Sequence, residues 1–279
     1  MLENIKIVAD SSADLLTLEA FPFASVPLKI ITTEKEYTDD AALDVPAMVD
    51  DLLAYNGKSS TSCPNPSDWL SAFGDAEQVF CVTITGTLSG SYNAACIAKN
   101  TYEQEHPGRR VFVIDSLSAG PELKLIVEEL QAQILAGTEF DENCKRIQSY
   151  QKKTGLLFML ESMKNLANNG RVSPLVAKMA GLLGIRVVGK ASDRGDLEPL
   201  NKCRGEKNAL DTIMQHLRSL QYAGGKIRIG HCLNASAAKG LCDRILAEFA
   251  EANVEIYASR GLCSFYAERG GLMIGFEKK

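Results

Sequence analysis

The sequence predicts an α/β protein of two α/β domains, the first with a parallel sheet covered by helices and the second with a mixed sheet. Short apolar runs of strand length alternate with longer runs of helical periodicity, which is the pattern of a sheet covered by helices. Three strand-like runs of the first half end in small polar residues, as expected where parallel strands bring a site to their carboxyl edge. In the second half, a hairpin pattern lies among strand–helix units, and this favours a mixed sheet.

The first half holds four strand-like runs and five helical ones. Its first strand, residues 5–9, is followed by the polar residues 10–14, which suit either a site or a simple helix cap. Asn65 before Pro66 is typical of a helix start, and Gly137 is typical of a helix end. The other strands are expected at residues 25–32, 79–84 and 111–115, the helices at 45–55, 67–73, 93–105, 121–136 and 141–153, and an irregular loop at 58–67.

The second half continues this alternation around one hairpin. Asn169 and Gly170 predict a tight turn with a positive φ angle. Residues 192–196 are polar and lie between two strand-like runs, which predicts a β-hairpin. The strands are expected at residues 156–160, 185–190, 197–203, 226–231, 254–258 and 271–276, and the helices at 162–167, 176–183, 205–220 and 235–250. We therefore expect one domain at residues 1–153 and another at 154–279.

Composition excludes several classes of function. The net charge of -5, without a basic cluster, argues against nucleic acid as a partner. No apolar run reaches the length of a membrane span and no leader pattern precedes the first strand, so we expect a cytoplasmic protein. The eight cysteines include no C-x-x-C pair, which argues against a zinc site or a redox pair. Because the glycine-rich phosphate-binding motifs are also missing, neither a metal nor a nucleotide cofactor is expected.

Residues 83–92 are the strongest local candidate for a binding site. They contain five Ser and Thr residues and two glycines, between an apolar strand and a helical run. Small residues let a ligand approach the backbone, and the N–H groups of a helix N-terminus favour an anion. An ordinary Ser- and Gly-rich loop that caps a helix explains the same composition. The loop at residues 58–67 is a second concentration of hydroxyl groups.

Two alternatives to a simple binding site are open at this point. A hydrolase or transferase would pair a serine of residues 83–92 with His231, the only histidine placed at the end of a predicted strand. A histidine satisfied in the core or at the surface is the more ordinary explanation. A diverged scaffold that keeps the fold without a ligand is the other alternative.

Six stretches, in order along nearly the whole chain, resemble the DegV family of bacterial fatty-acid-binding proteins. Each motif alone is weak, but six in register are specific. They are Ile7-Val8-Ala9-Asp10-Ser11-Ser12-Ala13-Asp14, Ser60-Thr61-Ser62-Cys63-Pro64, Leu88-Ser89-Gly90-Ser91-Tyr92, Val113-Ile114-Asp115-Ser116, Asn169-Gly170-Arg171-Val172-Ser173 and Lys202-Cys203-Arg204-Gly205.

The resemblance implies a protein that holds one long-chain fatty acid between two domains. Members of this type are the lipid-carrying, non-catalytic subunit of a fatty acid kinase, and a separate ATP-using subunit forms the acyl phosphate that enters phospholipid synthesis. By resemblance, Thr61 and Ser89 hold the carboxylate, with Ser62 and Gly90 in the same two loops. The resemblance also puts Arg171 and Arg204 near the head group or the partner surface. Ser11, in the polar residues after the first strand, is a further candidate for such a contact.

The chain departs from the family pattern at Tyr266. Family members usually carry a His-x-Gly-Pro-Gly segment whose histidine helps to bind the head group. Here Tyr266 takes the place of the histidine, and Glu268-Arg269 replaces Gly-Pro. A phenol can still donate a hydrogen bond to a carboxylate, but it is neutral at pH 7 because its reference pKa is about 10. We therefore include Tyr266 among the expected carboxylate ligands.

Overall fold

The computed structural model describes residues 4–178 and 183–279. Its first sheet has four parallel strands in the order β2-β1-β6-β7. This arrangement confirms the predicted parallel sheet of the first half. The strands are β1 (Ile5–Asp10), β2 (Phe23–Val26), β6 (Gln78–Thr83) and β7 (Arg110–Asp115).

Helices cover both faces of this sheet because side chains alternate along its buried strands. Val8 and Val79 pack with α2 (Pro66–Phe73) and α3 (Ser91–Glu105) on one face. Ile7 and Phe80 pack on the other face against α4 (Pro121–Leu135), which is followed by α5 (Phe140–Gln151). Asn65 caps α2 and Pro66 is its first residue, as predicted.

The second sheet has six strands in the order β10-β9-β8-β13-β11-β12 and is mixed, as predicted. Only β11 and β12 pair in parallel, whereas the other four pairings are antiparallel. One face is covered by α8 (Glu206–Ser219) and α9 (Ala235–Glu248). The strands are β8 (Thr154–Leu160), β9 (Ile185–Ala191), β10 (Leu197–Arg204), β11 (Lys226–His231), β12 (Asn253–Ala258) and β13 (Leu272–Glu277).

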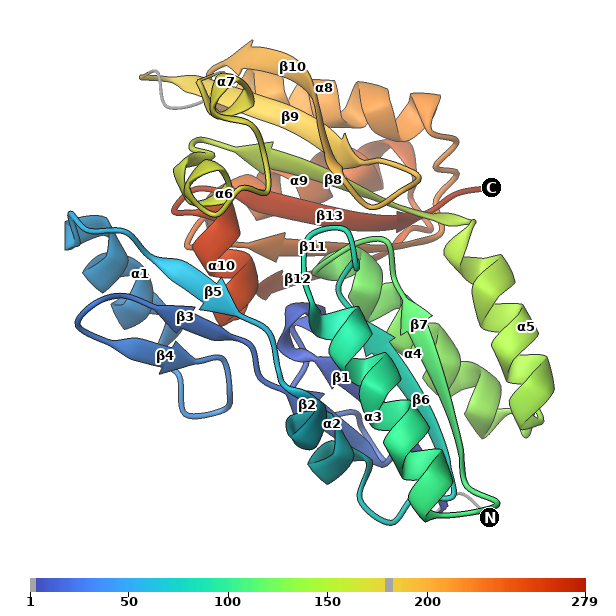
Figure 1. The fold of residues 1–279 in the computed structure, drawn as a ribbon. Helices are drawn as coiled ribbons and strands as arrows, with labels where there is room; N and C mark the ends of the chain where they lie inside the picture. The colour runs from blue at the N-terminus through green and yellow to red at the C-terminus, as the bar shows by residue number, and fades with distance from the viewer. Residues whose placement is uncertain (1–3, 179–182) are drawn as a thin grey trace.

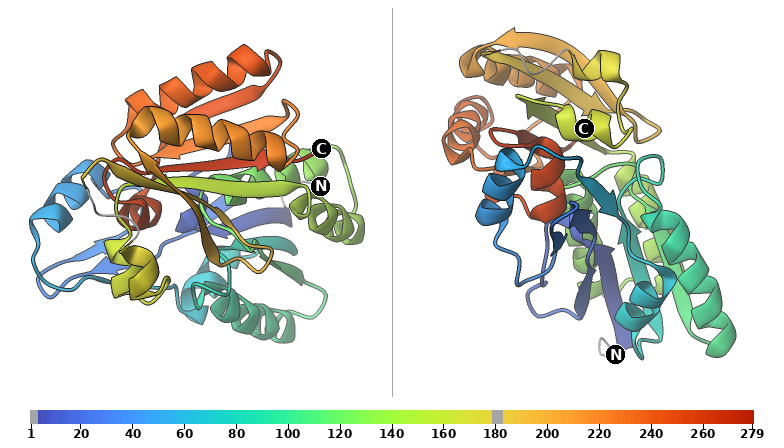
Figure 2. Two further views of the ribbon diagram at one scale, coloured as in Figure 1. Left: turned by 90° about the horizontal axis from the view of Figure 1, so that it is seen from above. Right: turned by 60° about the vertical axis from the view of Figure 1, so that its left-hand side comes forward.

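Helix α4 lies between the two sheets and contacts strands of both (Figure 1). A helix that is buried on all sides is expected in such a position. Its polar residues are paired with the second sheet: Lys124 Nζ lies 2.6 Å from Glu255 Oε1, and Arg228 Nη2 lies 2.8 Å from Glu128 Oε2. The views in Figure 2 show the second sheet and its helices stacked on the first half of the chain.

A small third sheet, β4-β3-β5, lies beside these two layers (Figure 1). Its strands are β3 (Lys29–Ile31), β4 (Glu36–Thr38) and β5 (Ser60–Ser62), and α1 (Val45–Ala54) connects β4 to β5. Three short helices and one 3₁₀ turn complete the fold: α6 (Lys164–Asn168), α7 (Pro174–Ala177), α10 (Gly261–Ala267) and η2 (Ser11–Ala13).

The structure differs from the sequence prediction at several places, one of which is β4, in a segment expected to be a polar loop. The single strand expected at residues 25–32 is two strands, because Pro27 lacks the N–H that a continuous ladder needs. The loop expected at 58–67 contains β5, and α10 was not expected at all. Of the helix expected at 176–183, only the part in α7 is seen, and residues 179–182 lie outside the described residues.

The predicted domain boundary at residues 153 and 154 coincides with the first residue of β8. The division into two domains stays a prediction, since α4 precedes this boundary and packs on both sheets. Among the helices of the described residues, none is both long and apolar enough to cross a membrane.

Candidate functional site

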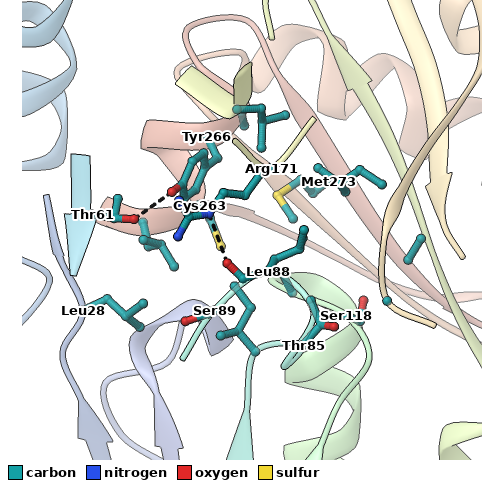
Figure 3. A pocket seen from close by; sticks show the side chains of 18 of the residues that line it. Leu28, Thr61, Thr85, Leu88, Ser89, Ser118, Arg171, Cys263, Tyr266 and Met273 are labelled. Atoms are coloured by element: carbon teal, nitrogen blue, oxygen red, sulfur yellow. Dashed lines mark hydrogen bonds between the residues drawn. The ribbon is translucent and has the colours of Figure 1, made fainter. Parts of the chain in front are cut away.

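A cavity of about 360 Å³ lies between the two halves of the chain (Figure 3). This volume falls in the range of small-molecule sites, roughly 300–1,000 Å³. Most of its wall is apolar and comes from loops of the first half and from strands of the second. The apolar residues include Leu28, Ile84, Leu88, Leu156, Phe158, Leu160, Leu166, Leu197, Leu262 and Met273.

Thr61 and Tyr266 form a hydroxyl pair at one side of this cavity (Figure 3). Their oxygens lie 2.7 Å apart, with Thr61 on β5 and Tyr266 on α10. Burial raises the pKa of the Tyr266 phenol, so this residue stays protonated at neutral pH. Because one of the two hydroxyls donates to the other, the pair has one remaining O–H to offer to a ligand.

Arg171 supplies positive charge to the same side of the cavity, next to Tyr266 in Figure 3. Among the described residues that line the cavity, it is the only Asp, Glu, His, Lys or Arg. The preceding Gly170 has a φ of 72°, as the predicted tight turn requires. Arg171 Nε donates to the Leu88 carbonyl at 3.1 Å, and Nη1 donates to the Asn169 carbonyl. These bonds hold the guanidinium against the loop at residues 83–92.

Ser89, Gly90 and Ser62 line the cavity beside Thr61. The Ser89 hydroxyl accepts a hydrogen bond of 3.3 Å from the Ser91 N–H, which leaves its own proton available to a ligand. A Cβ atom at Gly90 would lie 3.1 Å from the sulfur of Cys63, so the absence of a side chain lets the two loops approach each other closely. The two hydroxyl-rich loops found in the sequence therefore meet at one site.

The side chain of Asp10 stabilises the loop at residues 83–92 through hydrogen bonds. Its Oδ2 accepts hydrogen bonds from the Ile84 N–H at 2.9 Å and from the Ser91 hydroxyl at 2.6 Å. Burial raises the pKa of the Asp10 carboxyl, while the hydrogen bonds from Ser12, Ser91 and Ile84 oppose that rise. The polar residues after β1 therefore support the site without lining the cavity.

The structure places two other expected contact residues elsewhere. Ser11 is buried, and its hydroxyl accepts a 3.0 Å hydrogen bond from the Leu28 N–H, so it supports the cavity wall from behind. Arg204 is exposed at the end of β10 and is absent from the cavity lining. Neither residue lines the cavity, so the structure does not place either one in contact with a head group. A role of Arg204 at a partner surface stays a prediction.

His231 lies in a different depression, together with Ser259, Arg260 and Ser264. Its Nδ1 accepts a 3.3 Å hydrogen bond from the Asn234 N–H, and burial lowers its pKa. It is therefore not positioned as a base for Ser89, which lines the main cavity. Within residues 4–178 and 183–279, no cluster of His, Cys, Asp and Glu side chains is arranged to hold a metal ion.

The sequence analysis did not identify most of the apolar residues that line the cavity. Phe158 and Leu156 of β8 and Met273 of β13 face it, but their runs predict only buried strands. Cys263 also lines the cavity from α10. No local signal separates an apolar side chain that lines a cavity from one that fills a core. Only the pairing of β8 with β13 reveals which of these residues share a face.

Comparisons with known proteins agree with this geometry. The family model described as an uncharacterised protein of the DegV family matches residues 4–279. A DegV domain-containing protein of Streptococcus pneumoniae is 45% identical over 276 residues, 98% of either chain. A DegV family protein of Eubacterium eligens, solved with heptadecanoic acid, has a TM-score of 0.97 at 44% identity, over 99% of this chain and 100% of that one.

A second solved structure is equally similar. The Fatty Acid Kinase (Fak) B3 protein of Streptococcus pneumoniae, solved with linoleic acid, has a TM-score of 0.97 and 45% identity. The match covers 99% of this chain and 100% of the Fak B3 chain. The six motifs, the two-sheet architecture and these matches over nearly full length lead to one conclusion: this chain belongs to the DegV family.

Proposed function

We propose that this protein binds one long-chain fatty acid and presents its carboxylate to a separate ATP-dependent kinase subunit. The observation that carries the proposal is the apolar cavity between the two halves, whose lining also contains the hydroxyl groups of Thr61, Ser89 and Tyr266 and the guanidinium of Arg171. An acyl chain fits the apolar wall, and a carboxylate fits these polar groups.

The acyl chain and the carboxylate of the ligand contribute differently to the binding free energy. Each methylene moved from water into the cavity contributes roughly 0.8 kcal/mol, so a long chain supplies most of the binding free energy. A carboxylate loses its hydration on entering and needs hydrogen-bond donors in return. In this proposal Thr61, Ser89, Tyr266 and Arg171 provide them, with Ser62 and Gly90 in the surrounding loops.

The relatives support this ligand class. The Eubacterium eligens protein carries heptadecanoic acid, and the Streptococcus pneumoniae Fak B3 protein carries linoleic acid. Both share the fold of this chain over nearly its full length. The name of the second protein also connects it with a fatty acid kinase, and this is the support for a kinase partner.

The proposal assigns the phosphoryl transfer to the partner and no catalytic residue to this chain. The Thr61–Tyr266 pair, Ser89 and Arg171 are binding groups, and none of them needs to act as a base. The proposed place of action is the cytoplasm, where reducing conditions suit the eight free cysteines.

Mass spectrometry of the purified protein after denaturation tests the proposal. We expect release of one long-chain fatty acid for each protein chain, and rebinding of that acid after delipidation. A purified protein that carries a nucleotide or a sugar phosphate, or one that fails to bind any C16 to C18 acid after delipidation, would overturn it. Addition of a cognate fatty acid kinase subunit and ATP should then consume the bound acid.

A further inference from the structure

Helix α10 (Gly261–Ala267), which carries Tyr266, is anchored to the first half of the chain by a buried carboxylate. Asp39 follows β4 and is 0% exposed. Its Oδ1 accepts the Gly261 N–H at 2.8 Å and its Oδ2 accepts the Leu262 N–H at 2.8 Å, across 222 and 223 residues of sequence. Both oxygens are thus used to bind the first two N–H groups of the helix, which have no partner within the helix itself.

Gly261 is the residue that makes this close contact possible. A Cβ atom at this position would lie 2.7 Å from Asp39 Oδ1 and 2.6 Å from Leu43 Cδ2. Any side chain would therefore push the start of α10 away from the carboxylate. The contact requires a glycine on the helix and a short acidic side chain opposite it.

Asp14 binds the same segment in a different way. Its Oδ1 accepts the Arg260 N–H at 2.8 Å, while its buried Oδ2 accepts no N–H or O–H donor in the described part of the chain. Only the weak Cys263 thiol also interacts with this carboxyl. Two neighbouring buried carboxylates thus hold three successive N–H groups. Asp39 needs both of its oxygens as acceptors, whereas Asp14 needs only one.

Residues from both the first and the last turn of α10 line the cavity. Leu262, Cys263, Tyr266 and Ala267 all line it. Tyr266 lies in the same short helix as Gly261, so we expect a displacement of the first turn to move the Tyr266 hydroxyl relative to Thr61. The Thr61–Tyr266 distance of 2.7 Å depends on this placement.

We propose that Asp39 is a positioning residue of the head-group site, which holds α10 so that Tyr266 meets Thr61 and the carboxylate of the ligand. The inference rests on the proposed function, since it concerns the binding of a fatty acid. Asp39 does not touch the cavity, and its effect on the ligand is transmitted through the backbone of α10.

The same isosteric substitution at the two carboxylates tests this role. Asp39→Asn places an NH₂ group against one of the two N–H groups of α10, because an amide offers only one acceptor oxygen. Asp14→Asn can keep its oxygen on Arg260 and turn its NH₂ toward the position that accepts no N–H or O–H donor. The matched probes are linoleic acid and linoleyl alcohol, titrated into the delipidated full-length variants.

We expect Asp39→Asn to weaken the binding of linoleic acid by about tenfold, which is the scale of one lost hydrogen bond to a charged group. Binding of linoleyl alcohol should change by about twofold or less, because neutral hydrogen bonds are roughly half as strong. Asp14→Asn should leave both affinities within about twofold of the wild type. In a Tyr266→Phe background, Asp39→Asn should have no further effect on linoleic acid.

Equal losses of affinity for linoleic acid and linoleyl alcohol would show that Asp39 is only structural. Full additivity of the effects of Asp39→Asn and Tyr266→Phe on linoleic acid binding would show the same. Either result would overturn the inference. If Asp39→Asn does not fold, Gly261→Ala displaces the same helix start, and the same selective loss is expected. A delipidated wild-type protein that binds neither linoleic acid nor any other C16 to C18 acid contradicts the proposed function instead. The two failures are therefore distinguishable.

Discussion

The hydroxyl oxygens of Thr61 and Tyr266 lie 2.7 Å apart although 205 residues separate them in the chain. The pair joins the small third sheet to α10 at the polar side of the cavity (Figure 3). It therefore connects the two halves of the protein and provides the proposed head-group donor in one interaction.

Replacement of Thr61 by Val removes the hydroxyl and keeps the volume. We expect the affinity for a C18 fatty acid to fall about tenfold, because a donor to a charged carboxylate is lost. Isothermal titration of delipidated protein measures the change. Thr33→Val is a matched control, since the Thr33 and Tyr55 hydroxyls form a similar pair at 2.8 Å on an exposed surface. An equal loss in both variants would contradict the role of Thr61.

Replacement of Arg171 by Gln should weaken the binding of a fatty acid more than the binding of the corresponding alcohol. The guanidinium is the only cationic group among the described cavity residues, so its loss leaves the carboxylate without an opposite charge. The salt dependence of binding should also decrease, because a charge–charge term disappears. Arg194→Gln serves as the control, since its side chain is 88% exposed at the tip of the β9–β10 hairpin. Unchanged selectivity between acid and alcohol in Arg171→Gln would exclude a head-group contact.

Ala191 offers a way to shorten the cavity. It lines the wall from β9, and replacement by Trp should fill part of the space. We expect binding of a C18 acid to weaken much more than binding of a C12 acid, because each excluded methylene costs roughly 0.8 kcal/mol. Competition between the two acids, read by mass spectrometry, gives the ratio. Ala247→Trp on the exposed surface of α9 should leave the ratio unchanged.

Cys63 can report occupancy of the site. It is half-buried and lines the cavity next to Gly90, whereas five of the eight free cysteines are buried. A bound fatty acid should slow the alkylation of Cys63 by N-ethylmaleimide several-fold, as measured by peptide mass spectrometry. Cys96 is also half-buried and does not line the cavity, so its rate is the internal control. Equal protection of both thiols would indicate a global change rather than a local ligand.

Asp14 should make stability depend on pH. Burial raises the pKa of its carboxyl from 3.8 to about 7, and repulsion from Asp39 adds to this while the Arg260 N–H and Lys124 oppose it. The folded state then binds the proton more tightly than the unfolded chain. The contribution of Asp14 to stability therefore falls as the pH rises from 3.8 to about 7, and is level above that.

Asp14→Asn removes this ionisation. Its stability relative to the wild type should increase across the same pH window, as measured by urea denaturation. Asp141→Asn should show the opposite sign and only below about pH 3.8, because its hydrogen bond with Arg110 lowers the pKa of that exposed carboxyl from 3.8. A stability difference for Asp14→Asn that does not vary with pH would contradict the expected shift.

The sequence predicted those features that depend on local patterns. Alternating apolar and amphipathic runs were enough for β1, β6, β7 and the β9–β10 hairpin, and the Asn65–Pro66 pair marked the start of α2. Ser, Thr and Gly residues at positions 83–92 indicated either an anion site or a capping loop, and the structure places Ser89 of this stretch and Thr61 of the loop at 58–67 in the wall of one cavity.

The features that were missed depend on long-range packing. Helix α10 is only seven residues long, and its start is stabilised by Asp39 from another part of the chain, so no local cap predicts it. Strand β5 is three polar residues that pair only because β3 lies beside them. Arg204 matched a family motif, but its position relative to the cavity follows from the sheet and not from the motif.

The position of α4 between the two sheets has a consequence for modularity. Truncation at the end of α5 would remove β8 and β13 and leave one side of α4, including Lys124, without its partners. A fragment of residues 154–279 would in turn lack the helix that covers one face of its sheet. We therefore expect neither half to fold on its own. We expect the whole chain to unfold in a single cooperative transition. Halves from two relatives should combine into a stable chimera only when α4 matches the sheets on both of its sides.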